Sequence, residues 1–246
     1  MIAMAPEISI VVPLHNEAPN VGPLAQRLAA AFNNSTAIEM LFVDDGSTDE
    51  TWNEILKAQA SDARVRALRH DRKAGQSAAL WTGFTNSRGS LLATLDGDLQ
   101  NDPADLPGMV TELANCDMVS GIRTKRMDNW LRRVSTRTAR AARKLVLGID
   151  FQDSSCGVRV FKRAILPSLP GFDSIHRFMP ILAHNAGAVV RQVPVSHHPR
   201  TAGKSKYGLW NRLGRGIYDL VMVRLFLKKQ LRKVGVFEAQ AQLKLR

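Results

Sequence analysis

The sequence predicts an α/β protein in which helices cover a mostly parallel sheet. Short apolar runs rich in β-branched residues recur along the N-terminal half, helical segments separate them, and polar clusters directly follow three of them. Parallel strands need helical crossovers, and strands buried on both faces form nearly continuous apolar runs. With 246 residues, 45% of them hydrophobic, the chain is long enough for one such core.

Four strands are expected in this half, each of them a short apolar run: 7–13, 39–44, 64–69 and 90–95. Three helices alternate with them: 20–32, 50–60 and 75–86. Pro13 closes the first strand, and Ser47 or Thr48 is the expected cap of the second helix. Strands and helices in strict alternation favour a parallel sheet.

Three polar clusters follow predicted strands at the point where each strand ends: His15-Asn16-Glu17, Asp44-Asp45-Gly46-Ser47 and Asp96-Gly97-Asp98. In open α/β sheets, ligands bind beyond the carboxyl ends of the strands. We therefore expect the three clusters to converge on one edge of the sheet.

Asp96 and Asp98 can both reach one divalent cation if the strand breaks at Gly97. Hard cations such as Mg²⁺ and Mn²⁺ prefer carboxylate oxygens, and one or two protein carboxylates often suffice. Such a loop is by itself more often a solvated turn. The apolar strand before it and the other two clusters favour a metal site.

The cluster that begins at Asp44 has two interpretations as well. Its carboxylates could accept hydrogen bonds from a nucleotide base or a ribose hydroxyl. The same residues also suit a strand-to-helix turn that ends in a helix cap. The cluster alone does not decide between them.

Charge is divided unevenly along the chain. Residues 1–121 hold 8 Lys and Arg against 16 Asp and Glu, whereas residues 122–246 hold 26 against 6, which gives the net +12. This division predicts a cation site in the first half and an anionic partner for the second, either a nucleic acid, a phosphorylated substrate or a membrane surface.

A basic amphipathic helix is predicted over residues 129–147. Its apolar positions are Leu131, Val134, Thr138, Ala141 and Leu145, and its basic positions are Arg133, Arg137, Arg140 and Lys144. This pattern favours a helix at a membrane surface over a solvated charged face. A last strand is expected over 188–195. A helix over 209–231 would either pack on the core or lie at the same surface.

Six segments, in order, resemble the family 2 glycosyltransferases of GT-A fold, and among them the polyprenyl-phosphate sugar synthases typified by dolichol-phosphate mannosyltransferase. The segments are 11–17 (VVPLHNE), 43–49 (VDDGSTD), 75–80 (GQSAAL), 96–103 (DGDLQNDP), 153–159 (DSSCGVR) and 200–207 (RTAGKSKY). The ordered set is far more specific than any one motif. His15 and Cys156 depart from the residues common in the family, which leaves the choice of donor open.

The resemblance implies a role for each matching residue. The metal, Mg²⁺ or Mn²⁺, would be held by Asp96, Asp98 and Gln100. The nucleotide sugar would be bound by Pro13, His15, Glu17, Asp44, Asp45, Gln76, Asp96, Arg200 and Lys206. The catalytic and acceptor-positioning residues would be Asp98, Arg123, Arg133 and Asp153.

The implied reaction is the inverting transfer of one sugar, by a hexosyltransferase, from a UDP- or GDP-sugar to a polyprenyl phosphate. Because such a phosphate is already ionised at neutral pH, a general base is less necessary than for a hydroxyl acceptor. One alternative is a saccharide hydroxyl acceptor, for which Asp153 would be the base. The other is a basic nucleic-acid-binding protein. With 6% aromatic residues and no nucleic-acid motif, the chain does not favour it.

Domains and location follow as expectations. We expect a catalytic domain over 1–208 and a basic, apolar helical tail over 209–246. No run reaches the ~18 apolar residues of a spanning helix, no signal peptide is recognisable, and Cys116 and Cys156 suit a reducing compartment. The protein is therefore expected at the cytoplasmic face of the cell membrane, held by lipid or by a membrane-protein partner.

Overall fold

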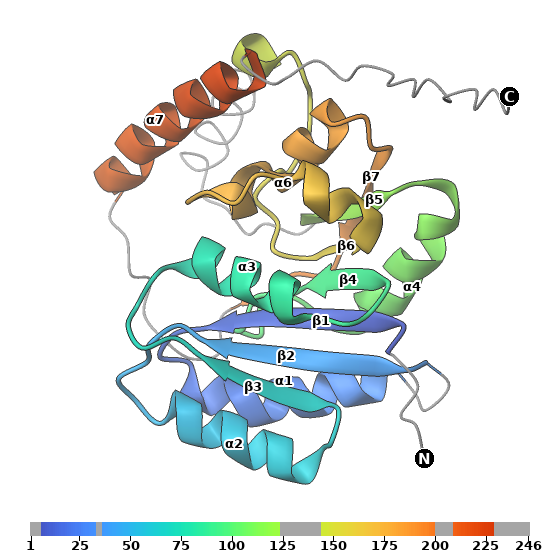
Figure 1. Cartoon of the computed structure of the whole chain (residues 1–246), viewed down its shortest axis with the longest axis vertical. Coiled ribbons are helices and arrows are strands. Elements are labelled where there is room, and N and C mark those ends of the chain that lie inside the picture. The colour runs from blue at the N-terminus through green and yellow to red at the C-terminus, as the bar shows by residue number, and fades with distance from the viewer. Residues whose placement is uncertain (1–5, 33–35, 124–143, 200–208, 229–246) are drawn as a thin grey trace, which may run out of the picture.

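The computed structural model of the chain describes residues 6–32, 36–123, 144–199 and 209–228 (Figure 1). One sheet runs through the molecule, with helices on both faces. Its strands are β1 (Ile8–Leu14), β2 (Ile38–Asp44), β3 (Val65–Arg69), β4 (Leu91–Thr94), β5 (Met118–Arg123), β6 (Arg159–Lys162) and β7 (Val190–Val195).

The strand order is β3-β2-β1-β4-β6-β5-β7. Neighbouring strands are parallel except where β6 pairs with β4 and with β5. It follows that β6 alone runs against the other six strands, and the predicted mostly parallel sheet is confirmed.

The helices are α1 (Ala18–Ala31), α2 (Thr51–Ser61), α3 (Gln76–Asn86), α4 (Asp105–Glu112), α6 (Ile175–Asn185) and α7 (Leu209–Lys228). The first three lie within two residues of their predicted bounds. Helix α1 begins earlier than predicted because Pro19 fits its first turn, where a missing N–H costs nothing.

Two α-helices and two strands between residues 99 and 187 were not predicted, namely α4, β5, β6 and α6, nor were the short 3-10 helices Leu113–Asn115 and Arg163–Ser168. Strand β7 begins at Val190, two residues later than expected. Most of the predicted helix 129–147 lies outside the described residues, although Lys144 to Leu147 are helical. The predicted helix from Leu209 is confirmed as far as Lys228.

Two buried clusters cover the two faces of the sheet. On one face Ile8, Ile10 and Val12 of β1 pack with residues of α1, α2 and α4. On the other, Val11 packs with residues of α3, α6 and α7. This alternation follows from the two-residue period of a strand, and it explains why the strands are apolar throughout.

The strand register brings the three polar clusters to one edge. Leu14 of β1 is the partner of Asp44 in β2, and Val11 is the partner of Thr94 in β4. The residues after Leu14, Asp44 and Thr94 therefore leave the sheet on the same side. The predicted convergence is confirmed.

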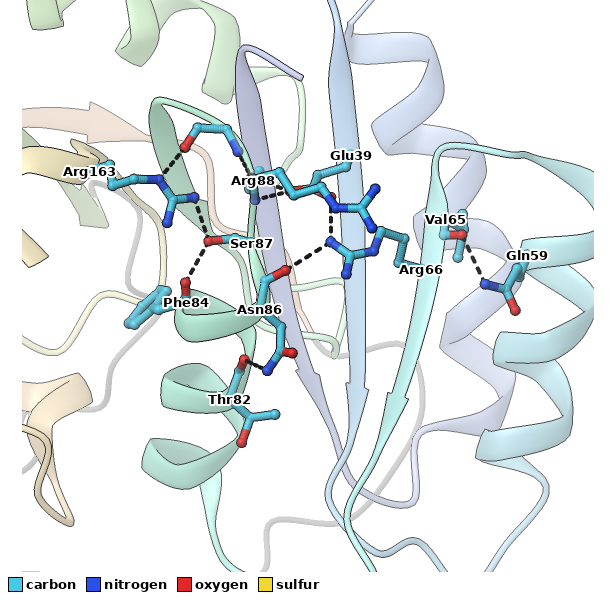
Figure 2. Close-up of polar contacts among 12 residues, drawn as sticks. Glu39, Gln59, Val65, Arg66, Thr82, Phe84, Asn86, Ser87, Arg88 and Arg163 are labelled. Carbon is cyan, nitrogen blue, oxygen red and sulfur yellow. Dashed lines mark hydrogen bonds and ion pairs between the residues drawn. The ribbon is translucent and has the colours of Figure 1, made fainter. Parts of the chain in front are cut away.

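The opposite edge of the sheet holds a buried carboxylate, Glu39 of β2 (Figure 2). It accepts hydrogen bonds from the Ser9 hydroxyl at 2.6 Å, the Arg88 N–H at 2.5 Å and the Arg66 guanidinium at 2.6 Å. Burial alone would raise the pKa of Glu39, but these three bonds together lower it below its usual value. The network fixes the α3–β4 connection far from the polar clusters.

Candidate functional site

The loop after β1 is joined to the loop after β2 by hydrogen bonds. His15 donates from Nδ1 to the carbonyl oxygen of Asp45 at 2.9 Å, and the Asn16 N–H donates to the Ser47 hydroxyl at 3.0 Å. The backbone of Asn16 is in the left-handed region, with a φ of 55°. The predicted capping of α2 by Ser47 or Thr48 is wrong, because α2 begins only at Thr51, whose N–H donates to the Asp49 carboxylate at 3.0 Å.

Asp45 is 3% exposed and both of its carboxylate oxygens are engaged. Oδ1 accepts from the Ala74 N–H at 2.8 Å and from His70 at 2.9 Å, and Oδ2 accepts from the Gly75 N–H at 2.8 Å. Burial would raise the pKa of Asp45, but these bonds outweigh it and the pKa is lowered. Asp45 therefore anchors the segment that leads into α3.

Asp44 is fully buried at the end of β2. Its Oδ1 accepts from the Ser47 N–H at 3.0 Å. Its Oδ2 forms an ion pair with Arg69, whose Nε lies 3.0 Å away, but the geometry of this contact is not that of a hydrogen bond. Of the two aspartates, Asp44 is thus the one with an oxygen that accepts no hydrogen bond in the structure.

Asp96 lies just beyond β4 and accepts a 2.8 Å hydrogen bond from the Gln76 amide at the start of α3. Burial, and then the negative charge of Asp98, raise the pKa of Asp96 to about 6. Its side chain is partly exposed because it lines a narrow cavity. Two carboxylates that repel each other in this way suit a shared cation.

Gly97 serves this loop in a different way from the one predicted. The left-handed residue of the turn is Leu99, with φ of 59°, and Gly97 is not among the residues with positive φ. A Cβ at Gly97 would instead collide with the side chain of Leu14. A side chain at position 97 would therefore force the Leu14 side chain of β1 to move.

Gln100 is joined to the chain that follows β7. The His198 N–H donates to the Gln100 carbonyl at 2.7 Å, and the Gln100 amide donates to the His198 carbonyl at 3.4 Å. The segment just before Arg200 therefore lies beside the Asp96 loop. Arg200 and Lys206, like Arg133, lie outside the described residues.

Arg123 and Asp153 form a two-point ion pair. Nε of Arg123 donates to Oδ2 at 2.8 Å and Nη2 to Oδ1 at 2.9 Å, and Ser155 also donates to Oδ1 at 3.1 Å. Although burial opposes its charged form, the bonds to Asp153 raise the pKa of Arg123. Both oxygens of the predicted general base are thus occupied.

A cavity of about 150 Å³ lies next to Asp96. Its described lining comes from α3, the β4 end, the start of β6 and α6: Gln76, Leu80, Asp96, Ser155, Gly157, Arg159, His176 and Arg177. A Cβ on Gly157 would fall on the Asp96 carboxylate, so this glycine makes room for it. The cavity is mostly polar and includes Asp96 itself.

Six of the eight lining residues were not predicted as site residues, and three of the six are ionisable: Arg159, His176 and Arg177. Arg159 is 1% exposed, and its Nη2 donates to the carbonyls of Ser154 at 3.1 Å and His176 at 2.6 Å. Burial lowers the pKa of Arg159. Arg159 belongs to the 153–159 motif, so the family resemblance could have identified it as a site residue. His176 and Arg177 belong to no recognised motif.

The predicted metal ligands Asp96, Asp98 and Gln100 stay a prediction. Within the described ranges, no three His, Cys, Asp or Glu side chains are grouped as they would be around a metal ion. The side chains of Asp96, Asp98 and Gln100 carry the hard oxygen atoms that Mg²⁺ or Mn²⁺ prefers, and such ions often take only one or two protein carboxylates when phosphates complete the shell.

Comparison with known proteins gives one family and several relatives. Residues 9–169 match the family model described as glycosyl transferase family 2. Dodecaprenyl-phosphate galacturonate synthase of Rhizobium johnstonii is 37% identical, over 92% of this chain and 69% of its own length. Undecaprenyl-phosphate 4-deoxy-4-formamido-L-arabinose transferase of Edwardsiella ictaluri is 35% identical, over 87% and 66%. The chain spans about two thirds of the length of these relatives.

Solved structures share the fold. Glucosyl-3-phosphoglycerate synthase from Mycobacterium tuberculosis, in complex with UDP, has a TM-score of 0.65 and 20% identity, over 96% of this chain and 85% of that one. The same enzyme with Mn²⁺, UDP-glucose and phosphoglyceric acid has a TM-score of 0.63 and 19% identity, over 97% and 85%. The predicted fold class is confirmed, apart from its interfacial helices.

Proposed function

Because this chain belongs to glycosyl transferase family 2, we propose that it moves one sugar from a UDP- or GDP-sugar to a polyprenyl phosphate. The observation that carries the acceptor is the similarity to relatives named as polyprenyl-phosphate sugar enzymes, which extends over 87% to 92% of the chain. The loops after β1, β2 and β4 converge on one sheet edge and would form the donor site there.

Asp96, Asp98 and Gln100 would hold Mg²⁺ or Mn²⁺. The fit is supported by the raised pKa of Asp96, since burial and the neighbouring Asp98 charge disfavour an isolated carboxylate there. The metal would supply Lewis acidity that neutralises the leaving diphosphate. Gln76 keeps the Asp96 carboxylate oriented through its 2.8 Å hydrogen bond.

The nucleotide would lie against the loops after β1 and β2. Pro13, His15 and Glu17 border it in this proposal, with Asp44 or Asp45 as the base-contacting aspartate. Protein groups already bind both oxygens of Asp45, whereas Asp44 is fully buried but keeps one oxygen that accepts no hydrogen bond. Arg200 and Lys206 would clamp the diphosphate, as the family resemblance implies.

The state of Asp153 favours a phosphate acceptor over a saccharide hydroxyl. A hydroxyl must lose its proton to a base, whereas a phosphate monoester is already an anion. Asp153 is held on both oxygens by Arg123 and is only 7% exposed, so it is poorly placed to take a proton. The ionised phosphate, positioned by Arg123 and Arg133, would attack the anomeric carbon in line and invert it.

We also propose that the enzyme acts at the inner face of the cell membrane. The support for contact with a membrane surface is an exposed apolar stripe on α7, formed by Tyr218, Val221, Met222, Leu225 and Phe226, each between 40% and 64% exposed. Residues at this spacing share one helix face. Within the described residues, no helix is long and apolar enough to cross a membrane. A membrane-protein partner would be a second means of attachment.

The test is an assay of purified protein with labelled UDP- and GDP-sugars, Mn²⁺ or Mg²⁺, and undecaprenyl phosphate. A preceding thermal-shift screen selects the donor, because a ligand that binds the native state raises the melting temperature. The proposal predicts label in the lipid fraction with one donor. Label in a saccharide without lipid phosphate, or no transfer with any donor, would refute it.

A further inference from the structure

The cavity beside Asp96 has one wall that the proposed roles do not use. This wall is the first turn of α6, which carries His176 and Arg177. Among the described lining residues, Arg159 and Arg177 carry cations, and Asp96 is the single carboxylate. If Asp96 holds a metal, the remaining cavity is lined by positive charge.

The start of α6 is held firmly in place. The Ser77 hydroxyl lies 2.7 Å from Nδ1 of His176 and accepts from the Ser174 N–H at 2.9 Å. Ser174 has a φ of 75°, a conformation that costs a non-glycine residue on the order of 1–2 kcal/mol and persists only when its surroundings impose it. Gln76, next to Ser77, binds Asp96. The first turn of α3 thus connects the Asp96 loop and the α6 wall.

Arg177 extends from this wall and is ion-paired with a residue of the C-terminal helix. Its Nη1 lies 3.4 Å from Oδ2 of Asp219, which is 8% exposed on the inner side of α7. A guanidinium has five N–H donors, and the described side-chain contact uses one of them. Donors therefore remain for a ligand in the cavity.

We propose that Arg177 binds an oxyanion other than the donor diphosphate, and that Asp219 of α7 positions it. The oxyanion is either a carboxylate on the transferred sugar or the phosphate of the acceptor, since a guanidinium binds both in the same two-point manner. The inference deepens the proposed function and rests on it. It also makes α7 part of the catalytic unit.

The first experiment compares Arg177→Gln with wild type in direct binding measurements with Mn²⁺. The probes are UDP, UDP-galactose, UDP-galacturonate and farnesyl phosphate. We expect unchanged affinity for UDP, and an affinity lower by about tenfold or more for either UDP-galacturonate or farnesyl phosphate. A loss for UDP-galacturonate but not UDP-galactose identifies a sugar carboxylate, and a loss for farnesyl phosphate alone identifies the acceptor phosphate.

The matched control is Arg191→Gln, which removes another arginine paired with a carboxylate, that of Glu112 at 2.6 Å, outside the cavity lining. It should leave every affinity unchanged. Unaltered binding of all probes by Arg177→Gln, or an equal loss for all four including UDP, would overturn the inference. Wild-type protein that binds no nucleotide and transfers no sugar would instead refute the proposed function.

A charge exchange separates positioning from substrate binding. Arg177→Asp combined with Asp219→Arg restores an ion pair between α6 and α7 but removes the cation from its place on α6. We expect the exchange to recover thermal stability lost in Asp219→Arg alone, without recovering transfer. Asp219→Glu should keep activity, and Asp219→Asn should raise KM more than it lowers kcat. Full activity of the exchanged protein would show that Arg177 is structural only.

Discussion

At the scale of single residues, Gly157 is the position where one methyl group has the most specific effect. A Cβ there would overlap the Asp96 carboxylate, which is the end of a side chain and can rotate away. Gly157→Ala should therefore fold normally but displace Asp96, and a displacement of about 1 Å can reduce turnover ~100-fold. Transfer rates and melting temperatures of the purified variant measure both effects.

Gly108→Ala is the matched control for that substitution. Gly108 lies within α4, and a Cβ there meets no atom within 4 Å. This variant should keep full activity. If Gly157→Ala is equally active, the Asp96 carboxylate is not the group that the donor site depends on.

Metal binding should depend on pH through Asp96. Its pKa is raised to about 6, so below that pH a proton competes with the cation for the carboxylate. We expect the dissociation constant for Mn²⁺ to rise steeply as the pH falls from 7 to 5, as measured by calorimetry without nucleotide. A constant affinity over this range would place the metal on other ligands.

Among the elements, β2 depends on its buried carboxylate. Glu39→Gln keeps the shape but places an amide N–H₂ against existing donors, so it should lower the free energy of unfolding by about 1–3 kcal/mol in urea titration. The exposed pair of Glu54 and Lys57 gives the control, since Glu54→Gln should change stability by less than about 0.5 kcal/mol. Equal effects of the two substitutions would contradict the role assigned to the network.

The same network predicts that Glu39 contributes less to stability as the pH falls. The pKa of Glu39 in the folded protein lies below its usual 4.5, so its contribution to stability is complete above pH 4.5 and is lost as the pH falls through the lower, folded value. Wild type should therefore lose more stability than Glu39→Gln between pH 5 and the acid limit of folding. A parallel decline of both proteins would argue against this linkage.

Helix α7 should bind lipid through its outer stripe. Replacing Leu225 and Phe226 by serine removes apolar area that would enter the bilayer, at about 1.5–3 kcal/mol for each full side chain. Binding to vesicles that contain anionic lipid should weaken tenfold or more in a flotation assay. Leu56→Ser, on α2, removes another side chain that is 40% exposed and should have no effect. Unchanged flotation would exclude the stripe as the docking surface.

For the molecule as a whole, the sequence predicted the N-terminal half well and the rest poorly. The alternating strands and helices up to Thr94 have strong local periodicity, and the ordered motifs located Asp96 and Asp98. Strand β6 has four residues and gains its place only by antiparallel pairing with β4 and β5. Long-range pairing of that kind leaves no local signal.

The candidate site, like the fold, was predicted only in part. Asp44, Asp45 and Asp96 were predicted as one group from their places after strands, yet their roles differ because of contacts made by distant residues. Asp45 is committed to the segment 70–75, and Asp96 shares a cavity with Arg177 of α6. The proposed boundary between residues 208 and 209 stays a prediction, although Val223 of α7 is buried in the core.

The most direct test of the central claim is the rate of sugar transfer to undecaprenyl phosphate by wild type and by Asp98→Ala in one assay. Wild type should give metal-dependent labelled lipid, and an Asp98→Ala protein of unchanged melting temperature should transfer sugar more slowly by about 100-fold or more. A near-normal rate for Asp98→Ala, or no labelled lipid from wild type with any donor, would contradict the central claim.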